Sequence, residues 1–94
     1  MPQFHLTDHA RSRSQQRAIP EVVLDGLLSY GRSVHDHRGS MIVFFDHRAK
    51  NRLRREWGEN EFRQYEAKLD AYAVLARDGS VVTVGHRTRR IPRS

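Results

Sequence analysis

The sequence contains no cysteine, so it can form neither a disulfide framework nor a metal site built on thiolates. It also lacks long apolar runs, because no stretch approaches the roughly 20 apolar residues that a membrane-spanning helix needs. No signal-peptide pattern is visible. These absences predict a cytoplasmic protein that does not enter a membrane.

Lysine is scarce as well, since arginine supplies 15 of the 17 basic residues. The basic residues outnumber 11 acidic ones and give a formal net charge of +6. An excess of this size favours polyanionic partners. The planar guanidinium group matches phosphate oxygens two at a time, which suits contacts with a phosphate backbone. We therefore expect a nucleic acid partner, with RNA favoured over DNA.

Apolar residues are also scarce, because only 38 of the 94 residues are Ala, Val, Ile, Leu, Met, Phe, Trp or Gly. The usual share is roughly 45–50%. The length predicts a single domain over residues 1–94, and the basic tail from about residue 88 is expected to fray. A thin core of this kind is marginal alone, so a bound partner is expected to stabilise it.

Two helices are predicted near the start of the chain, over residues 8–17 and 20–29. Thr7 or Asp8 can cap the first helix. The second carries apolar residues at positions 23, 24, 27 and 28, which form one helical stripe. Gly31 follows it and is expected to end it in the left-handed conformation that glycine adopts easily.

Strands are predicted for residues 32–36 and 41–46, and the apolar run in the second favours an interior strand. Asp46 can cap a further helix, which Gly58 interrupts before a last helical segment. Residues 71–77 and 80–86 form a hairpin pattern joined by Asp78 and Gly79, a two-residue turn signal. Gln3 to Leu6 is a possible short opening strand.

This order predicts an α+β fold in which two N-terminal helices pack on a four-stranded antiparallel sheet. The two helical segments between residues 46 and 70 form an insertion between the second and third main strands.

The first predicted helix is polar, and His9, Arg13 and Arg17 recur on one of its faces at intervals of four residues. A bound phosphate would offset the repulsion between these cations. Near the start of a helix, the dipole disfavours the charged form of His9, which makes this side chain a candidate general base. A solvated face whose arginine stems cover the sheet is an equally open interpretation.

A second basic cluster, GHRTRR, follows the apolar strand at residues 81–84. Alternation along the strand places His86 on the face of Val82 and Val84, with Arg87 on the opposite face. His86 is therefore a candidate proton donor to a leaving oxygen. The alternative is a core histidine bonded to the backbone, followed by a basic tail.

A third cluster lies in the predicted helix after Asp46 and contains Arg48, Lys50, Arg52, Arg54 and Arg55. It runs around the helix instead of along one stripe, and three glutamates follow it closely. This pattern indicates an electrostatic surface for a nucleic-acid backbone. No aromatic residue is interleaved with the basic clusters, which argues against a platform for stacking single-stranded bases. His35 and His37 share one side of a strand, but a third metal ligand would have to be guessed, so no metal is predicted.

The segments HARSR at residues 9–13, QQRAIP at 15–20 and VVTVGHRTRRI at 81–91 carry a family resemblance. Together they resemble the bacterial domain-of-unknown-function family 4258, and the resemblance extends from Phe4 to Pro92. That family is similar to the RelE-like and BrnT-like toxins, small ribonucleases with paired helices on a four-stranded antiparallel sheet. The resemblance implies an RNA-cleaving ancestry. The helical insertion is longer than in a minimal toxin of that type.

The leading functional prediction is a metal-independent endoribonuclease of toxin–antitoxin type that needs no cofactor. His9 would accept the proton of the RNA 2′-hydroxyl and His86 would protonate the leaving 5′-oxygen, although the two roles are interchangeable. Arg13 and Arg89 would stabilise the phosphoryl charge, and Tyr72 would position the substrate. The predicted nucleic-acid contacts are Arg17, Arg52, Arg55, Arg87 and Arg90.

Two alternatives remain open at this point. One is a module that binds RNA or DNA without cleaving it, with an affinity that falls steeply with salt. The other is an accessory protein whose basic face docks an acidic partner such as an antitoxin.

Overall fold

The computed structural model describes residues 5–36 and 38–87 and has an α+β fold, as expected from the sequence. The predicted fraying tail, with Arg89 and Arg90, lies outside the described residues. The elements in chain order are α1 (Asp8–Gln16), α2 (Glu21–Tyr30), β1 (Arg32–His35), β2 (Met41–Phe44), α3 (His47–Trp57), α4 (Glu59–Tyr65), the short 3₁₀ helix η1 (Glu66–Lys68), β3 (Ala71–Leu75) and β4 (Val81–His86).

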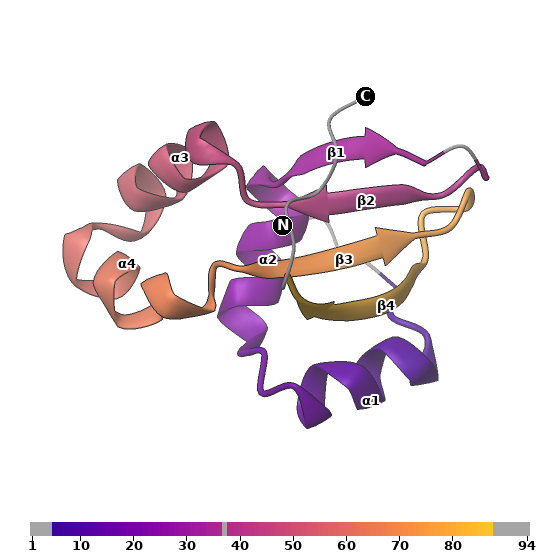
Figure 1. Cartoon of the computed structure of the whole chain (residues 1–94). Helices are drawn as coiled ribbons and strands as arrows, with labels where there is room; N and C mark the ends of the chain where they lie inside the picture. The colour runs from indigo at the N-terminus through magenta and orange to yellow at the C-terminus, as the bar shows by residue number, and fades with distance from the viewer. Residues whose placement is uncertain (1–4, 37, 88–94) are drawn as a thin grey trace.

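The four strands form one antiparallel sheet in the order β1-β2-β3-β4, which confirms the predicted four-stranded antiparallel sheet (Figure 1). The apolar strand β2 is therefore interior, between β1 and β3. Of the opening strand expected over residues 3–6, residues 3 and 4 lie outside the described part, and Leu6 forms an isolated parallel bridge with Val81. Helices α3 and α4 lie between β2 and β3 in the chain and extend beyond one end of the sheet (Figure 1).

The main core lies between the sheet and the helices, with α1 packed on β4 and α2 packed on β2 and β3. Strand residues that point toward the helices are fully buried, including Val43, Ala73 and Val84. Leu27 of α2 and Leu53 of α3 are both 0% exposed and complete this core. The two polar helices have few buried residues, which are Ala10 in α1 and Ala49 and Leu53 in α3.

Helix α1 begins as the capping signal predicts, because the Thr7 hydroxyl accepts the N–H of Ala10. Its end has an unusual feature. Ala18 adopts a φ of 51°, in the left-handed region that side chains other than glycine rarely occupy. The N–H of Ala18 bonds to Gln15 and that of Ile19 bonds to Ser14, the two hydrogen bonds of a Schellman motif. The turn thus places a strained alanine where glycine is usual.

Helices α2 and α3 approach closely where α2 contains Gly26. A Cβ atom at this glycine would lie 2.9 Å from Leu53 and 3.2 Å from Trp57, both on α3. The prediction for Gly31 is wrong, because its φ of −64° and ψ of 156° are extended and not left-handed. Glycine is required there for space, since a Cβ would lie 2.4 Å from the Leu27 carbonyl oxygen and 2.7 Å from Val43.

Asp46 caps α3 as predicted, since its carboxylate accepts the N–H of Ala49 at 2.8 Å. Gly58 separates α3 from α4 with a φ of 84°. In residues 5–36 and 38–87, none of these helices combines the length and apolar character of a membrane span.

The hairpin between β3 and β4 has a longer turn than the two-residue signal predicts. The N–H of Ala76 bonds to the carbonyl of Ser80, so residues 77–79 form the turn, with Gly79 at a φ of 87°. The backbone N–H of Ser80 donates to Asp78 at 2.9 Å, and this bond holds the pKa of the Asp78 carboxyl below its ordinary value of 3.8. The strand register also shifts between Val74 and Leu75.

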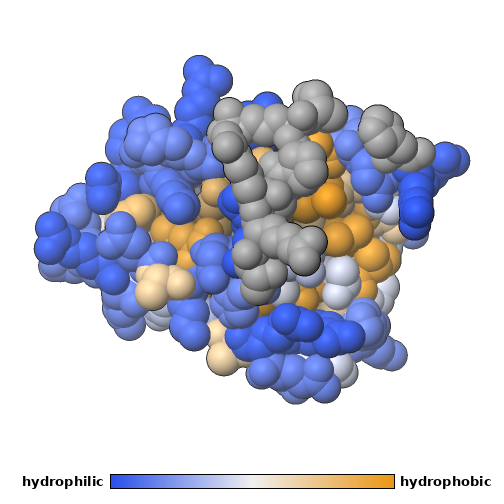
Figure 2. Space-filling model, viewed as in Figure 1, coloured by the Kyte–Doolittle hydropathy of each residue, from blue (hydrophilic) through white to orange (hydrophobic). Residues whose placement is uncertain are grey.

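The sheet face away from the helices carries side chains paired across neighbouring strands, such as Val34 with Ile42 and Phe44 with Tyr72. Figure 2 looks onto this face and shows apolar surface over the strands, with mostly hydrophilic surface over the helices at the rim. The polar and charged groups are thus concentrated on the helices and at the strand ends.

Candidate nucleic-acid interface

His86 ends β4 and is bonded by protein groups at both of its ring nitrogens. Nδ1 lies 2.7 Å from a carboxylate oxygen of Asp70, and Nε2 lies 2.8 Å from the backbone carbonyl oxygen of Arg17. The His86 side chain is 25% exposed and that of Asp70 is 49% exposed. We call the group formed by Arg17, Ala18, Asp70 and His86 the α1–β4 junction.

Both partners of His86 are hydrogen-bond acceptors, so both ring nitrogens must donate for the two bonds to form together. The junction joins the end of α1 to the strand through the His86 ring, whose two nitrogens face Asp70 and the Arg17 carbonyl. The bond to the Arg17 carbonyl agrees with the alternative in which His86 is bonded to the backbone. The catalytic role of His86 stays a prediction.

His9 lies in the first turn of α1 and is exposed. The Nε of Arg13 donates to its Nε2 over 3.4 Å, which confirms that the two side chains share one helix face. The contact is long and exposed, so it orients His9 only weakly.

The structure does not bring His9 and His86 together. His86 contacts Arg17, which lies eight residues after His9, or about 12 Å further along α1 at the usual helical rise. An acid and a base that act on one phosphodiester must each reach it within hydrogen-bond distance. The helix packs on β4 as the predicted site requires, but the two imidazoles lie at its opposite ends.

Tyr72 and Arg87 lie on the other side of the sheet from His86. Tyr72 pairs with Gly85, and a Cβ at this glycine would lie 3.0–3.2 Å from the tyrosine ring. The guanidinium of Arg87 lies 5.0 Å from the ring centre of Phe44 and donates to the carbonyl of Phe45 at 3.5 Å. The predicted Tyr72 and Arg87 therefore share a face with each other, not with His86.

The basic residues of α3 fall into two groups. At the end of the helix, Arg54 pairs with Glu59 at 3.0 Å and lies 4.5 Å from the ring centre of Phe62. Glu59 also pairs with Arg63 at 3.3 Å. The acidic residues after α3 thus neutralise this end, as the sequence suggests. The second group is Arg48, Arg52 and Arg55, which follow one another at intervals of four and three residues and share a face.

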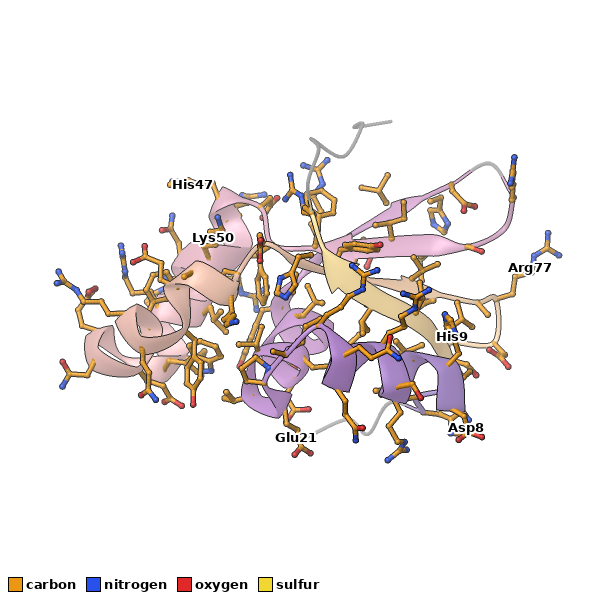
Figure 3. All side chains as sticks on the ribbon, turned by 60° about the horizontal axis from the view of Figure 1, so that its bottom comes forward. Asp8, His9, Glu21, His47, Lys50 and Arg77 are labelled. Carbon is orange, nitrogen blue, oxygen red and sulfur yellow. The ribbon has the colours of Figure 1, made fainter. Side chains whose placement is uncertain are left out.

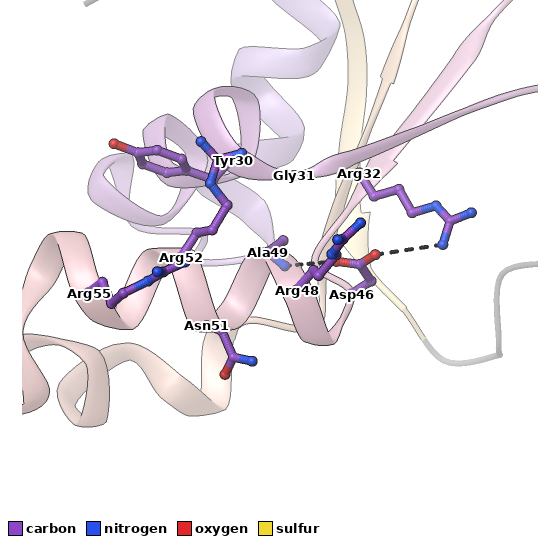
Figure 4. Close-up of a pocket in the computed structure, with 9 residues that line it drawn as sticks. All are labelled: Tyr30, Gly31, Arg32, Asp46, Arg48, Ala49, Asn51, Arg52 and Arg55. Carbon is purple, nitrogen blue, oxygen red and sulfur yellow. Dashed lines mark hydrogen bonds and ion pairs between the residues drawn. The ribbon is translucent and has the colours of Figure 1, made fainter.

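That second group lines a pocket with a volume of about 770 Å³, the α3 pocket (Figure 4). Arg32 of β1 and Asp46 complete its charged lining. Tyr30 and Gly31, at the end of α2, line it together with Ala49 and Asn51 of α3. Asp46 pairs with Arg32 at 3.6 Å and also caps α3, so both of its oxygens are engaged.

The described lining of the α3 pocket contains four guanidinium groups and a single carboxylate. In the part of the chain that the structure describes, Arg48, Arg52 and Arg55 form no ion pair. Figure 3 shows Lys50 and His47 of α3 at one side of the molecule and His9 at the other, so α1 and α3 present separate basic surfaces. The basic surface of α3 includes a concave part, the α3 pocket.

Sequence reasoning selected Arg52 and Arg55 but missed Arg32, Arg48 and Tyr30 as parts of one site. Arg48 was visible only as a member of a cluster without a preferred side. Tyr30 and Arg32 flank Gly31, which allows the chain to pass close to α2 at this point. The expectation that no aromatic residue accompanies the basic clusters is wrong in three dimensions, because the guanidinium of Arg52 lies 5.4 Å from the ring centre of Tyr30.

Of the two histidines considered as metal ligands, only one lies in the described residues. His35 ends β1, whereas His37 lies outside the described residues. Over residues 5–36 and 38–87, no group of three or more His, Asp or Glu side chains is arranged to hold a metal ion.

At the junction, the polar groups bond to one another, whereas Arg48, Arg52 and Arg55 of the α3 pocket form no ion pair among the residues that the structure describes. Comparison with known proteins adds nothing to this geometry, because no family model, curated protein or solved structure matches the chain.

Proposed function

We propose that the protein binds RNA and that the α3 pocket is the centre of its binding surface. The observation that carries the proposal is the charge of the pocket, where four arginines accompany one carboxylate that is already engaged. Guanidinium groups bind phosphate oxygens in pairs, and neutralising phosphates releases counterions from the nucleic acid. The pocket suits a phosphate backbone better than a neutral ligand.

The spacing of the arginines along α3 supports an anionic partner. Like charges three or four residues apart destabilise an isolated helix by about 0.2–0.5 kcal/mol per pair, and Arg52 forms such pairs with both Arg48 and Arg55. Nearby glutamates pair with Arg54 and Arg63 instead. A bound phosphate turns the repulsion in the pocket into attraction.

The basic surface continues from the pocket onto the open face of the sheet. Arg32 is the cross-strand partner of Phe44, and Arg87 lies over the ring of that same phenylalanine. The two cations therefore flank one aromatic side chain, next to the pocket. A bound strand that leaves the pocket along β1 meets further positive charge there.

The test is a titration of the purified protein with a fluorescently labelled single-stranded RNA at several KCl concentrations, followed by fluorescence anisotropy. We expect an affinity that falls with salt, with a slope of about 0.7 in log–log form for each phosphate contacted. No measurable binding at low ionic strength would contradict the proposal. Tight binding to an acidic protein, without any to RNA, would support the accessory alternative instead.

A second candidate function is RNA cleavage by the metal-independent route, favoured by the contact of His9 with Arg13 on a helix packed against β4. His9 would remove the 2′-hydroxyl proton, and the 2′-oxygen would bond to phosphorus. The 5′-oxygen would leave with a proton taken from water, because His86 lies too far from His9 to act on the same phosphodiester, and the products would be a 2′,3′-cyclic phosphate and a 5′-hydroxyl end. The resemblance of the sequence to a family that is similar to the RelE-like and BrnT-like toxins also supports this candidate.

Incubation with RNA in EDTA separates the two functions. The binding proposal expects intact RNA and no change for His9→Ala. The cleavage candidate expects a cyclic-phosphate product that His9→Ala and Arg13→Ala both abolish. Toxicity on expression in bacteria that Arg13→Ala removes would be evidence for the toxin interpretation.

A further inference from the structure

Arg52 and Tyr30 form a cation–π contact at the rim of the α3 pocket. The guanidinium lies 5.4 Å from the ring centre, and Tyr30 is half-buried against the core from the last turn of α2 (Figure 4). The planes of arginine guanidinium groups are surfaces on which unpaired RNA bases stack. The pocket thus carries a planar cation next to a ring that is packed against the core.

The other charged side chains of the pocket lie within reach of the groups next to a stacked base. Arg48 and Arg55 lie one turn before and one turn after Arg52 on the same face of α3, so they span about 10 Å along the helix. This places a cation on each side of the stacking plane, where the phosphates before and after one nucleotide can be contacted. The volume of about 770 Å³ is within the range of about 300–1,000 Å³ that is typical of ligand pockets.

We infer that the α3 pocket binds one unpaired nucleotide of single-stranded RNA, with its base stacked on Arg52 and its flanking phosphates held by Arg48 and Arg55. The inference rests on the proposed RNA binding and goes further, because it names the strand type and the role of each side chain. Tyr30 is a positioning residue, since it acts through Arg52. A base inside a duplex is stacked and paired, so duplex RNA cannot occupy the pocket in this way.

Charge variants test the phosphate contacts. Arg48→Gln and Arg55→Gln should each lower the salt slope of single-stranded RNA binding by about 0.7. Lys50→Gln is the matched control, because Lys50 is an exposed cation of the same helix and does not line the pocket. An equal loss of slope in all three variants would mean diffuse binding to the whole helix and would overturn the inference.

Shape variants test the stacking. Arg52→Lys keeps the charge but removes the plane, so we expect a loss of about 5- to 150-fold in affinity with an unchanged salt slope. Tyr30→Leu should cause a loss of the same kind, and circular dichroism checks its fold because Tyr30 contacts the core. Wild-type affinity in Arg52→Lys would show that the pocket acts through charge alone.

Competition experiments separate this inference from the proposed function. Unlabelled single-stranded RNA should displace the probe at lower concentration than duplex RNA of equal phosphate content, and preference for the duplex would overturn the inference. If the wild type binds RNA and the pocket variants bind equally well, the inference fails while RNA binding stands. If the wild type binds no RNA, the proposed function itself fails.

Discussion

The α1–β4 junction and the α3 pocket both gather polar groups, but they differ in where these groups find partners. At the junction, His86 donates to Asp70 and to the carbonyl of Arg17, so its hydrogen bonds close within the chain. In the pocket, three arginines of one helix face share a space with a single carboxylate. The first arrangement is expected to contribute to stability, and the second to binding.

This difference shows that the composition of a basic or histidine-containing motif is not enough to identify a functional site. The GHR segment at the end of β4 has the residues expected of a catalytic centre, yet it joins two elements of the fold. The α3 cluster has no preferred side in the sequence, yet part of it forms a concave surface. Variants in the two regions should therefore separate stability from RNA affinity.

The largest effect is expected from Leu53→Ala, which removes the contact that holds α3 and the pocket against α2. Leu53 is 0% exposed and lies over Gly26, so the truncation leaves a cavity. We expect a loss of about 2–5 kcal/mol in the free energy of unfolding, measured in urea. A smaller loss would show that Leu53 does not anchor α3 against α2. The pocket would then not be held in place as the comparison of the two regions assumes.

His86→Ala is expected to have the next largest effect. It removes the side chain that bonds to both the Asp70 carboxylate and the Arg17 carbonyl, and because these groups are accessible to water, the free energy of unfolding should fall by about 0.5–1.5 kcal/mol. RNA affinity should stay at the wild-type value if the junction is structural. Unchanged stability together with a loss of RNA cleavage would reverse our assignment and favour the ribonuclease candidate.

Ala18→Gly should stabilise the protein by about 0.5–1 kcal/mol, because glycine adopts the left-handed φ of 51° without the steric cost that alanine carries. Thermal unfolding measures the change. Ala67→Gly is a useful control, since Ala67 lies in the 3₁₀ helix η1 and no such gain is expected there. A stability gain at both positions would argue against strain at the junction.

The smallest effect is expected from Arg52→Gln, which removes two like-charge pairs from α3. The relief of repulsion and the loss of the cation–π contact with Tyr30 nearly offset each other, so the free energy of unfolding should change by less than about 0.5 kcal/mol, while RNA affinity falls. Unchanged stability together with a lower affinity is the sign of a binding residue. A loss of stability together with a loss of affinity would mean that Arg52 has a structural role, as the junction residues do.

Local signals in the sequence located several elements closely. Thr7 and Asp46 cap their helices as predicted, since each rule concerns groups three residues apart. Gly31 shows the limit of such rules. A glycine after a helix is often left-handed, but here it is extended, because Val43 and the Leu27 carbonyl leave no room for a Cβ.

The sequence predicted the chemical type of the candidate site but not which residues come together to form it. Charge and arginine content indicated a phosphate-binding surface, and Arg52 and Arg55 were selected from the sequence. Their association with Tyr30 and Arg32 was not predictable, because it depends on how α2, β1 and α3 pack. The positions of His9 and His86 at opposite ends of α1 also depend on tertiary contacts.

The sequence by itself determined the net charge, the absence of thiol chemistry and most of the local capping and strand patterns, because these depend on composition or on neighbours within one or two turns. Only the tertiary structure decided that His86 bonds to a carbonyl 69 residues away and that Arg52 rests on Tyr30. Helix and strand periodicity determines which face a side chain occupies, but not which other element packs against that face.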